Sequence, residues 1–550
     1  MELISSFVSS TASDAWTVIY NYSIHITATL LVLYVVQKAI YELYFSPLCD
    51  VAGPWYAVIS NIWLTGHRLF FRQAMAVDAL FEKYGPVVRV GPRRVAFNDA
   101  GAARDVYVDC NFDKSTVYQG FKMNGHDQSI NILSGSVHAL RRKAFAQHYT
   151  TANLALYGPE IDEHVVQSVN ILRTIYGRRP VNCLELFPQL LIDVMCLISS
   201  GVRGEALATW AKTFSDETNV PDLLSVALSD MPAFCDMRGS FPTWMWNALC
   251  RIPNKRWNQF CQSESIVTQF VTARLEEIRK RVWAEEGKIQ NGNGHVKVDK
   301  IPLLERFLRT SPTSPEKMID EDIIAETMGQ LLAGIDMTAM TLAYLFWELS
   351  RRDDIMTQLR AELDAAMPVS NGSGRAFPDI AVLNELPYLN GFIKEGMSNT
   401  HNSLRTHSAG PSLLERVVPE PAVDSWSKES TPDFDLLGIP LPPGTIIATQ
   451  SWSLHRDPYI FPEPDLFNPD RWLNDAAERT MSGAMMAQQM IPFGLGSRMC
   501  GGMNLAQMML RFVVAAVVRN FDVVAPAETT EKSMAMRELF VSAEFAGSVD

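Results

Sequence analysis

The stretch FGLGSRMCGG at residues 493–502 constrains this chain more than any other, because it places one cysteine, Cys500, among glycines. Glycine adds no apolar area to a core and loses more conformational entropy on folding than other residues. A cluster of glycines therefore predicts a backbone that bends tightly beside a flat, bulky group. A helical pattern begins at Met503, and the unpaired amides at a helix start favour a thiolate. Such a thiolate can bind iron, and a haem with a thiolate ligand is suited to cleaving the O–O bond.

The spacing of this stretch resembles the haem-binding loop of the cytochrome P450 superfamily of haem-thiolate monooxygenases. Phe493, Gly496, Arg498, Cys500 and Gly502 match the fixed positions of the family pattern. The resemblance implies that Cys500 is the axial ligand of haem b and that Phe493, Arg498 and Gly502 help to bind this cofactor. The alternative is that Cys500 is an ordinary buried thiol, as the scattered spacing of the other seven cysteines predicts for them.

Composition narrows the class of protein. The chain has 550 residues, of which 47% are hydrophobic, and a formal net charge of −13. This predicts a globular protein with an apolar core and argues against a nucleic-acid-binding protein, whose surface is normally basic. Eight cysteines without paired spacing favour a reducing compartment. No linker or repeat divides residues 43–550, so we expect them to form one catalytic domain.

An apolar segment near the N-terminus predicts a membrane anchor within residues 1–42. Residues 15–36 contain no Lys, Arg, Asp or Glu, and a bilayer span needs about 20 apolar residues. A cleaved signal peptide and a buried soluble helix are the alternatives, although no basic residue precedes the segment. Lys38 beyond it favours a cytosolic C-terminal side. The runs LYFSPL at 43–48 and GPW at 53–55 resemble the proline-rich hinge of microsomal P450 enzymes, which implies the endoplasmic reticulum membrane.

Several downstream segments resemble the framework around the P450 haem. Residues 83–91 predict a turn followed by an alternating strand, and residues 438–445 predict a second turn and strand. His138 and Arg142 are four residues apart, which puts them on one face of a helix, and the resemblance implies that both bind a haem propionate. Arg416 stands where another propionate-binding arginine is found in the family. A solvated basic face is the alternative for 138–143, and Arg141 and Lys143 are candidates to face an acidic redox partner.

A helix expected over residues 317–349 carries a segment similar to the family's oxygen-activating motif. Ala333 and Gly334 leave a flat face, which the resemblance assigns to the approach of haem and dioxygen. Asp336 is the predicted proton relay. The family has threonine directly after the acid, whereas this chain has Met337 there and Thr338 one residue later. One helical step turns a side chain by about 100°, so Thr338, the candidate catalytic hydroxyl, need not replace the usual one. An ordinary ion pair for Asp336 and a bond from Thr338 to its own helix are the alternatives.

The segment that resembles the family's Glu-x-x-Arg helix departs from the pattern. Glu395 is present, but position 398 is Ser398, and the next matching arginine is Arg405. On a straight helix these two side chains would be about 15 Å apart along the axis. Residues 397–403 are rich in Asn, Ser and His, which have poor helix propensity. The segment therefore either bulges so that Arg405 returns to Glu395, or represents an error in the gene model. Arg471 is expected to complete this structural network through a bidentate pair with Glu395.

These matches predict a mainly α fold with small β-sheets, the P450 haem-thiolate fold, behind an N-terminal transmembrane helix. The resemblance implies a monooxygenase that uses NADPH indirectly, through a diflavin reductase with cytochrome b5 as a second candidate donor. By analogy with fungal members, we expect an apolar polyketide, terpenoid or indole-type scaffold of secondary metabolism. One alternative, motivated by Met337, is rearrangement, dehydration or coupling without oxygen insertion. Another is a haem-poor, inactive chain caused by the insert at 397–403.

Overall fold

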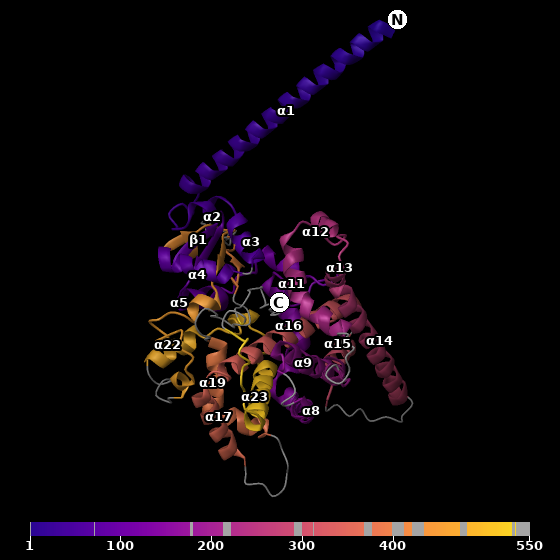
Figure 1. Ribbon diagram of the computed structural model, residues 1–550, viewed down its shortest axis with the longest axis vertical. Helices are drawn as coiled ribbons and strands as arrows, with labels where there is room; N and C mark the ends of the chain where they lie inside the picture. Colours follow the sequence, from indigo (N-terminus) through magenta and orange to yellow (C-terminus); the bar gives the residue numbers. More distant parts are fainter. Residues whose placement is uncertain are drawn as a thin grey trace.

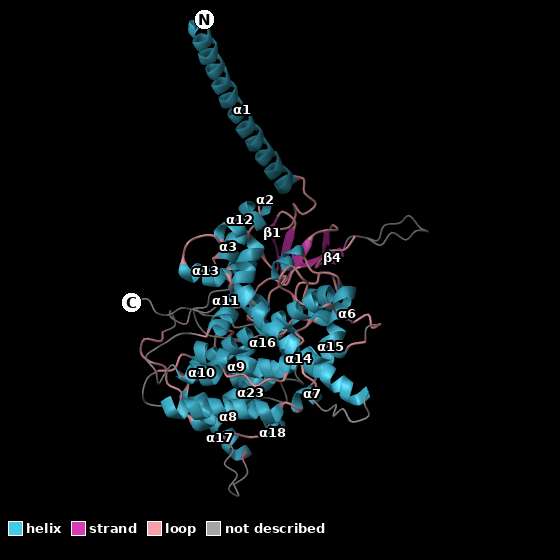
Figure 2. Ribbon diagram, turned by 90° about the vertical axis from the view of Figure 1, so that its right-hand side faces the viewer, coloured by secondary structure: helices cyan, strands magenta, loops and turns pink. Residues whose placement is uncertain are grey.

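Helices dominate the structure, a computed structural model that describes residues 2–70, 72–175, 180–212, 222–290, 300–311, 313–367, 377–398, 412–420, 434–473, 481–530 and 534. Figures 1 and 2 show a helical body with a small group of strands at one end, beside the foot of a long N-terminal helix. The prediction of a mainly α fold with small sheets is confirmed.

The helices of the first half are α1 (Glu2–Tyr44), α2 (Trp55–Ile59), α3 (Ile62–Leu69), α4 (Gln73–Tyr84), α5 (Ala100–Arg104), α6 (Gly135–Ala146), α7 (Thr151–Ala155), α8 (Gly158–Ile175), α9 (Cys183–Ser200), α10 (Ala206–Lys212), α11 (Leu223–Ser240), α12 (Thr243–Leu249), α13 (Lys255–Cys261) and α14 (Ser263–Gln290). They are followed by α15 (Leu303–Arg309), α16 (Asp320–Leu349), α17 (Asp353–Ala366), α18 (Ile380–Glu385), α19 (Pro387–Ser398), α20 (Ser451–Leu454), α22 (Met481–Gln489) and α23 (Met503–Asn520). Short single-turn segments are η1 (Asp105–Asp109), η2 (Thr116–Phe121), η3 (Gln147–Tyr149), η4 (Pro469–Trp472) and η5 (Gly496–Arg498).

Two small sheets lie at the end of the body nearest α1. The larger has the order β1-β2-β6-β3, formed by β1 (Val87–Gly91), β2 (Arg94–Phe97), β6 (Ile446–Ala448) and β3 (Arg416–Val417). β1 and β2 are antiparallel, β2 and β6 are parallel, and β3 is antiparallel to β6. The smaller sheet pairs β4 (Phe434–Leu436) with β5 (Ile439–Leu441). Both strand segments that the sequence predicts, at 83–91 and 438–445, are confirmed.

Helix α16 is the central element of the body. It packs against α9, α14 and α23, and most of its side chains are buried in the main hydrophobic core. Its first turn holds Asp320, Glu321 and Asp322, whose negative charges are favourable at a helix N-terminus. The helix therefore begins at Asp320, three residues later than the sequence predicts, and ends at Leu349 as expected.

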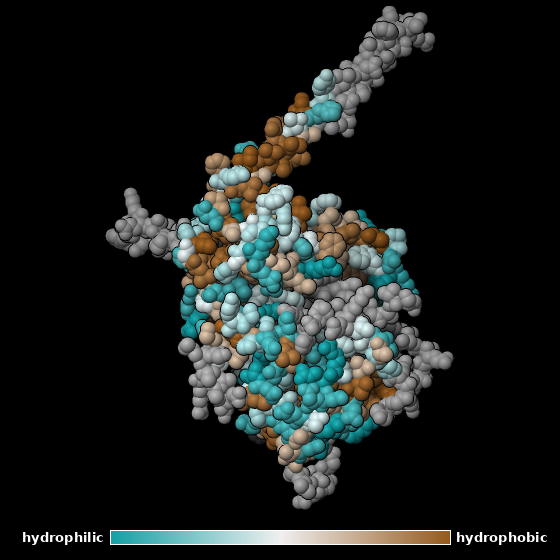
Figure 3. Space-filling view, turned by 60° about the vertical axis from the view of Figure 1, so that its left-hand side comes forward, coloured by the Kyte–Doolittle hydropathy of each residue, from teal (hydrophilic) through white to brown (hydrophobic). Residues whose placement is uncertain are grey.

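Helix α1 projects away from the body (Figure 1). Within the described side chains, the window His25–Tyr44 is apolar and long enough to cross a membrane, and 6% of it is buried. Figure 3 shows its brown, apolar side chains along the part of α1 that approaches the body. The apolar helix α9 passes the same test but is 78% buried, as expected of a core helix. This window overlaps the predicted span at 15–36 from His25 to Val36.

Two boundaries differ from the sequence prediction. The composition of residues 285–300, with Asn291-Gly292-Asn293-Gly294, predicts an exposed loop. Helix α14 nevertheless continues to Gln290, and residues 291–299 lie outside the described part of the chain. The resemblance to P450 enzymes also implies an irregular meander over residues 474–490, before the cysteine loop. This segment contains α22 (Met481–Gln489), a helix that the sequence does not predict.

Candidate active site

The cysteine loop bends as its glycines predict. Gly494 and Gly496 have φ of +74° and +65°, a region that other residues rarely adopt. A side chain on Gly496 would also collide with the backbone carbonyl of Tyr107. The amide of Cys500 donates to the carbonyl of Phe493 at 2.9 Å, which closes the loop. Helix α23 then begins at Met503.

The thiol of Cys500 lies at the start of α23 in a mostly buried setting. Burial raises its pKa, whereas hydrogen bonds from the amides of Gly502 and Met503 and the charge of Arg142 act in the opposite direction. These amides are the unpaired donors of a helix start. The local structure therefore supplies the stabilisation of a thiolate that the sequence pattern predicts.

A cavity of about 310 Å³ opens beside this thiol. It lies between the cysteine loop, α6, α9, α16 and the segment from Lys114 to Ile130. Among the residues in its wall are the predicted site residues His138, Arg142, Ala333, Gly334, Thr338, Arg416, Phe493, Arg498, Cys500 and Gly502. Residues from distant stretches of sequence are thus brought together around one sulfur atom.

A group of cations lies along one side of the cavity. Arg498 donates to the carbonyls of Ile132 (2.8 Å) and Leu133 (2.6 Å), and Arg416, which is 4% exposed, lies over the ring of Tyr107. Arg142 donates to the carbonyl of Met499.

The electrostatics of this group indicate that it binds an anion. Burial, and then Arg416 and Arg498, lower the pKa of Lys114. Burial and the neighbouring cations lower the pKa of His138 to about 3, and burial with Arg416 lowers the pKa of Arg498 to about 10. A carboxylate nearby, Glu415, is already held by Arg94 and Ser115.

Clustered buried cations are costly unless negative charge compensates them. The two carboxylates of haem supply such charge, and the thiol of Cys500 lies in the wall of the same cavity. The described residues therefore fit a haem with its propionates toward Lys114, His138, Arg142, Arg416 and Arg498. Lys114 was not found by sequence reasoning, because no motif marks it and only the fold brings it to Arg416.

A comparison with protein-family models matches residues 57–546 to the model described as Cytochrome P450. The chain belongs to the cytochrome P450 family. It is 27% identical to the cytochrome P450 monooxygenase cypX of Dothistroma septosporum over 95% of this chain and 94% of the relative. It is 26% identical to the monooxygenase stcB of Emericella nidulans (88% and 84%) and 26% identical to the tryprostatin B 6-hydroxylase of Aspergillus fumigatus (91% and 79%). The P450 fold and the assignment as an oxidoreductase of the monooxygenase type are confirmed.

Helix α16 carries the segment that resembles the oxygen-activating motif, and the side chains that it places in the cavity differ from those that the motif predicts. Ala333, Gly334, Met337 and Thr338 line the cavity, whereas Asp336 is not among its lining residues. Met337 follows Ala333 by one turn and is half-buried, whereas Thr338 follows Gly334 and is 5% exposed. Met195 of α9 packs over Gly334. The position that carries threonine in the family pattern is therefore occupied by a thioether on the cavity side.

The expected pair of Glu395 and Arg471 is present among the described residues, but it is not bidentate as predicted, because only Nε of Arg471 reaches the carboxylate. Glu395 is fully buried on α19, and its carboxylate accepts hydrogen bonds from Arg471 Nε (3.2 Å), the Asn468 amide (3.0 Å) and Trp472 Nε1 (2.7 Å). The other guanidinium nitrogens of Arg471 donate to the backbone carbonyls of residues 462, 463 and 466. Helix α19 ends at Ser398, and Arg405 lies outside the described residues.

The prediction that Arg141 faces a redox partner is wrong. Its guanidinium is 12% exposed and forms an ion pair with Asp322 of α16 at 2.9 Å. The i, i+4 pattern of this basic helix identifies one buried face but does not tell which neighbour covers the next residue. Lys143 is exposed, as expected for a surface cation.

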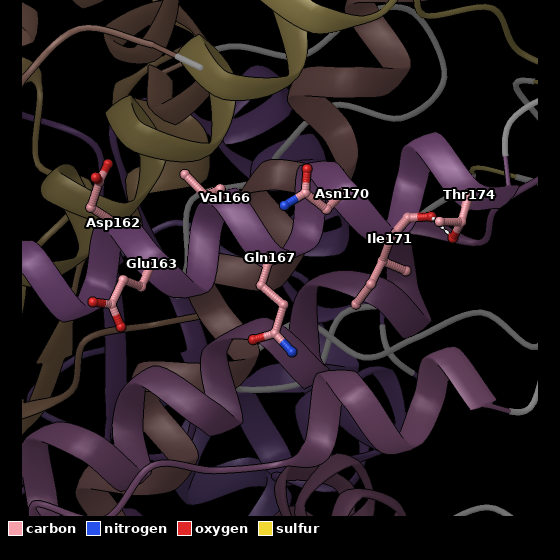
Figure 4. A pocket seen from close by; sticks show the side chains of 7 residues that line it. All are labelled: Asp162, Glu163, Val166, Gln167, Asn170, Ile171 and Thr174. Atoms are coloured by element: carbon pink, nitrogen blue, oxygen red, sulfur yellow. Dashed lines mark hydrogen bonds between the residues drawn. The ribbon is translucent and has the colours of Figure 1, made fainter. Parts of the chain in front are cut away.

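A second hollow of about 410 Å³ lies on the outside of α8 (Figure 4). The side chains shown in Figure 4 come from one helix and are of mixed polarity: Asp162, Glu163, Val166, Gln167, Asn170, Ile171 and Thr174. This hollow shares no lining residue with the cysteine cavity.

Proposed function

We propose that this P450 enzyme holds haem b through Cys500 and inserts one oxygen atom of O2 into an apolar scaffold of fungal secondary metabolism. The observation that carries the proposal is the cavity beside Cys500, in which the thiol and a group of buried cations lie together. The relation to cypX, stcB and the tryprostatin B 6-hydroxylase supports the monooxygenase reaction class. The indole, polyketide or terpenoid type of substrate is proposed by analogy with fungal members of the family.

Haem with a thiolate ligand supplies oxygen activation when bound. The chain's own residues have distinct tasks around it. The amides of Gly502 and Met503 stabilise the thiolate of Cys500, and Arg142, Arg416 and Arg498 with His138 would hold the haem propionates. Phe493, at the start of the cysteine loop, packs against the main hydrophobic core. Asp336 and Thr338 are the proposed proton-handling pair, and Ala333 and Gly334, which line the cavity, would border the cofactor. Glu395 and Arg471 keep α19 fixed to the segment before the cysteine loop.

We further propose a single-pass anchor in the endoplasmic reticulum membrane, with the catalytic domain on the cytosolic side. Helix α1 supports this through its exposed apolar side chains. Large apolar side chains are also exposed on α2, α3 and α12, which lie at the end of the body nearest α1 in Figures 1 and 2: Trp55, Ile62 and Trp244. Electrons then come from NADPH through a membrane-bound diflavin reductase, with cytochrome b5 as a second donor.

The reduced, carbon monoxide-bound difference spectrum tests the thiolate assignment. The wild-type protein should give the Soret band of a thiolate-ligated haem, and Cys500→Ser should lose it. Cys110→Ser is the matched control, because Cys110 is an exposed thiol outside the cavity, and it should keep the band. A Cys500→Ser protein that retains the band and its turnover would refute the proposal.

Met337 favours a second candidate function, the rearrangement, dehydration or coupling of a substrate without oxygen insertion. A thioether on the cavity side of α16 cannot donate a proton as a threonine hydroxyl does. Labelled dioxygen separates the two functions, because monooxygenation places the label in the product and the alternative does not.

The insert at 397–403 bears on whether the chain assembles at all. Deleting it would place Arg405 three residues after Glu395, in the order Glu395-Gly396-Leu404-Arg405, which restores the Glu-x-x-Arg spacing. We expect the deletion variant to bind more haem per protein if the insert harms the fold. Equal haem content with and without the insert would show that the fold tolerates the insert. If both proteins also bind one haem per chain, the alternative of an inactive, haem-poor chain is excluded.

A further inference from the structure

Glu326 is a buried acid in the wall of the cysteine cavity that the proposed mechanism does not use. It is 1% exposed and lies on α16, two turns before Gly334. Its carboxylate accepts hydrogen bonds from the amide of Ser129 (2.9 Å), the hydroxyl of Ser129 (2.7 Å) and Gln330 Nε2 (3.0 Å). Gln330 is itself fixed, since its Oε1 accepts from the hydroxyl of Tyr149 at 2.7 Å.

Two opposing influences act on the pKa of Glu326, and the net effect is to raise it. Burial disfavours the ionised carboxylate and raises its pKa above the ordinary value for glutamate. The donors Ser129 and Gln330, and the charge of Arg141, favour the ionised form and limit this rise. A carboxyl group under opposing influences of this kind can hold a proton and release it.

Polar groups on the same face of α16 lie between Glu326 and the partly exposed side chain of Asp322. Asp322, Glu326 and Gln330 follow one another at intervals of four residues and therefore share one face of α16. Arg141 of α6 pairs with Asp322 at 2.9 Å and lies close enough to act on the charge of Glu326. Asp322 is 25% exposed and also contacts Nδ1 of His126 at 3.1 Å. The partly exposed carboxylate of Asp322 therefore lies one helical turn from Glu326, on the side of α16 that faces solvent.

The same helix face continues into the cavity as Gly334 and Thr338, again at four-residue intervals. Of the acids on α16 whose placement the structure describes, Glu326 lines the cavity and Asp336 does not. The side chain one turn beyond Ala333 is Met337, which has no hydroxyl. An acid that touches the cavity is thus found at a position other than the one the family pattern indicates.

We propose that Glu326 supplies protons to the cavity during turnover, in addition to or in place of Asp336. This inference rests on the proposed monooxygenase function, whose overall balance is R–H + O2 + NADPH + H⁺ → R–OH + H2O + NADP⁺, with the electrons coming from the reductase. The carboxyl group of Glu326 gives its proton to a water molecule in the cavity, and Ser129 and Gln330 stabilise the carboxylate that remains. The carboxylate then takes up a proton from solvent at the edge formed by Asp322 and Arg141.

The test compares Glu326→Gln with the control Glu321→Gln, which changes an exposed acid of the same helix. The glutamine keeps an acceptor for Ser129 but cannot titrate. With reductase and NADPH, we expect Glu326→Gln to release several-fold more hydrogen peroxide per NADPH consumed and to change the solvent deuterium isotope effect. Glu321→Gln should behave as the wild type, and Glu326→Asp should restore part of the coupling.

A readout independent of turnover is the infrared difference between the wild-type holoenzyme and Glu326→Gln during a pH titration. We expect the carbonyl band of a protonated carboxylic acid that disappears as the pH rises and is missing from the variant. Absence of this band, or peroxide release equal to that of Glu321→Gln, overturns the inference while leaving the thiolate assignment intact. Absence of the carbon monoxide band in the wild-type protein instead overturns the proposed function, and this inference with it.

Discussion

The side chain of Met337 determines what α16 presents to the cavity one turn beyond Ala333. Replacing it with threonine would put a hydroxyl donor at that place. We expect Met337→Thr to increase product, or to lower peroxide release, several-fold per NADPH when proton delivery limits coupling. Met337→Leu conserves volume without adding a hydroxyl and is the control. An unchanged ratio of peroxide to NADPH in Met337→Thr would contradict this reasoning.

His148 predicts a pH dependence of stability. Its side chain is fully buried against the rings of Tyr149 and Tyr157, and burial together with Arg306 lowers its pKa to about 3. Above the ordinary histidine pKa of about 6.5, both states are neutral and the stability is fully present. As the pH falls from that value toward 3, the unfolded chain binds a proton that the folded chain does not, so stability decreases.

The expected slope of the unfolding free energy is at most about 1.4 kcal/mol per pH unit from this group. His148→Phe removes the titration while keeping an aromatic side chain, and should flatten the pH dependence over this range. Urea unfolding of the wild-type protein and His148→Phe at several pH values measures the slope of the unfolding free energy against pH. Identical slopes would show that His148 is not protonated on unfolding in that window.

At the level of single residues, the sequence predicted those side chains that a motif or a helix period marks. Cys500, Arg498, His138 and Arg142 line one cavity as expected. Lys114 and Glu326 could not be predicted, since their residue types are common and only the packing of distant segments places them in the same wall. Arg141 was misplaced for the same reason, because its partner Asp322 lies 181 residues away along the chain.

The attachment of α1 to the sheet gives a prediction at the scale of elements. Arg89 of β1 is 1% exposed and donates to the carboxylate of Glu42 at 2.6 Å and to the backbone carbonyls of Glu42 (2.8 Å) and Leu48 (3.1 Å). Removing one partner of a buried ion pair typically costs about 3–5 kcal/mol, because the other charge is left buried. Arg89→Met should destabilise the fold by an amount of this order.

Arg104→Met is the control, because Arg104 and Asp109 form a pair at 3.8 Å whose side chains are 64% and 55% exposed. Exposed pairs contribute about 0–1 kcal/mol. Chemical unfolding of the detergent-solubilised proteins compares the two variants. Equal unfolding free energies for Arg89→Met and Arg104→Met would mean that the buried network does not stabilise the body.

Elements were predicted best where local chemistry fixes their ends. The strands β1 and β5 and the end of α16 agree with the pattern, since turns with glycine or proline delimit the strands. The start of α16 and the end of α14 were misplaced by a few residues, because polar residues near a helix end are compatible with both helix and loop. In the α19 segment, the motif identified Glu395 and its partner Arg471. It did not predict the course of the chain after Ser398.

At the scale of the whole molecule, positive and negative charges are unevenly distributed. The chain carries a net charge of −13, yet the side of the cavity near Arg416 is a group of buried cations. Net charge therefore describes the molecule as a whole and gives no information about its interior. The family match over residues 57–546 and the exposed helix α1 distinguish a catalytic body from an apolar extension.

This distinction predicts that the anchor can be removed without loss of the fold, provided that the cut spares the network around Arg89. A variant lacking residues 2–36 keeps Glu42 and should move from the membrane to the soluble fraction with its carbon monoxide spectrum and unfolding free energy unchanged. A variant lacking residues 2–44 loses Glu42 as a partner of Arg89 and should also be less stable. The exposed side chains of Trp55, Phe70 and Trp244 should still give the shorter proteins some affinity for lipid vesicles, because tryptophan favours the membrane interface. If the variant lacking 2–36 stays in the membrane fraction after a high-salt wash, the body itself binds the membrane and α1 is not the principal anchor.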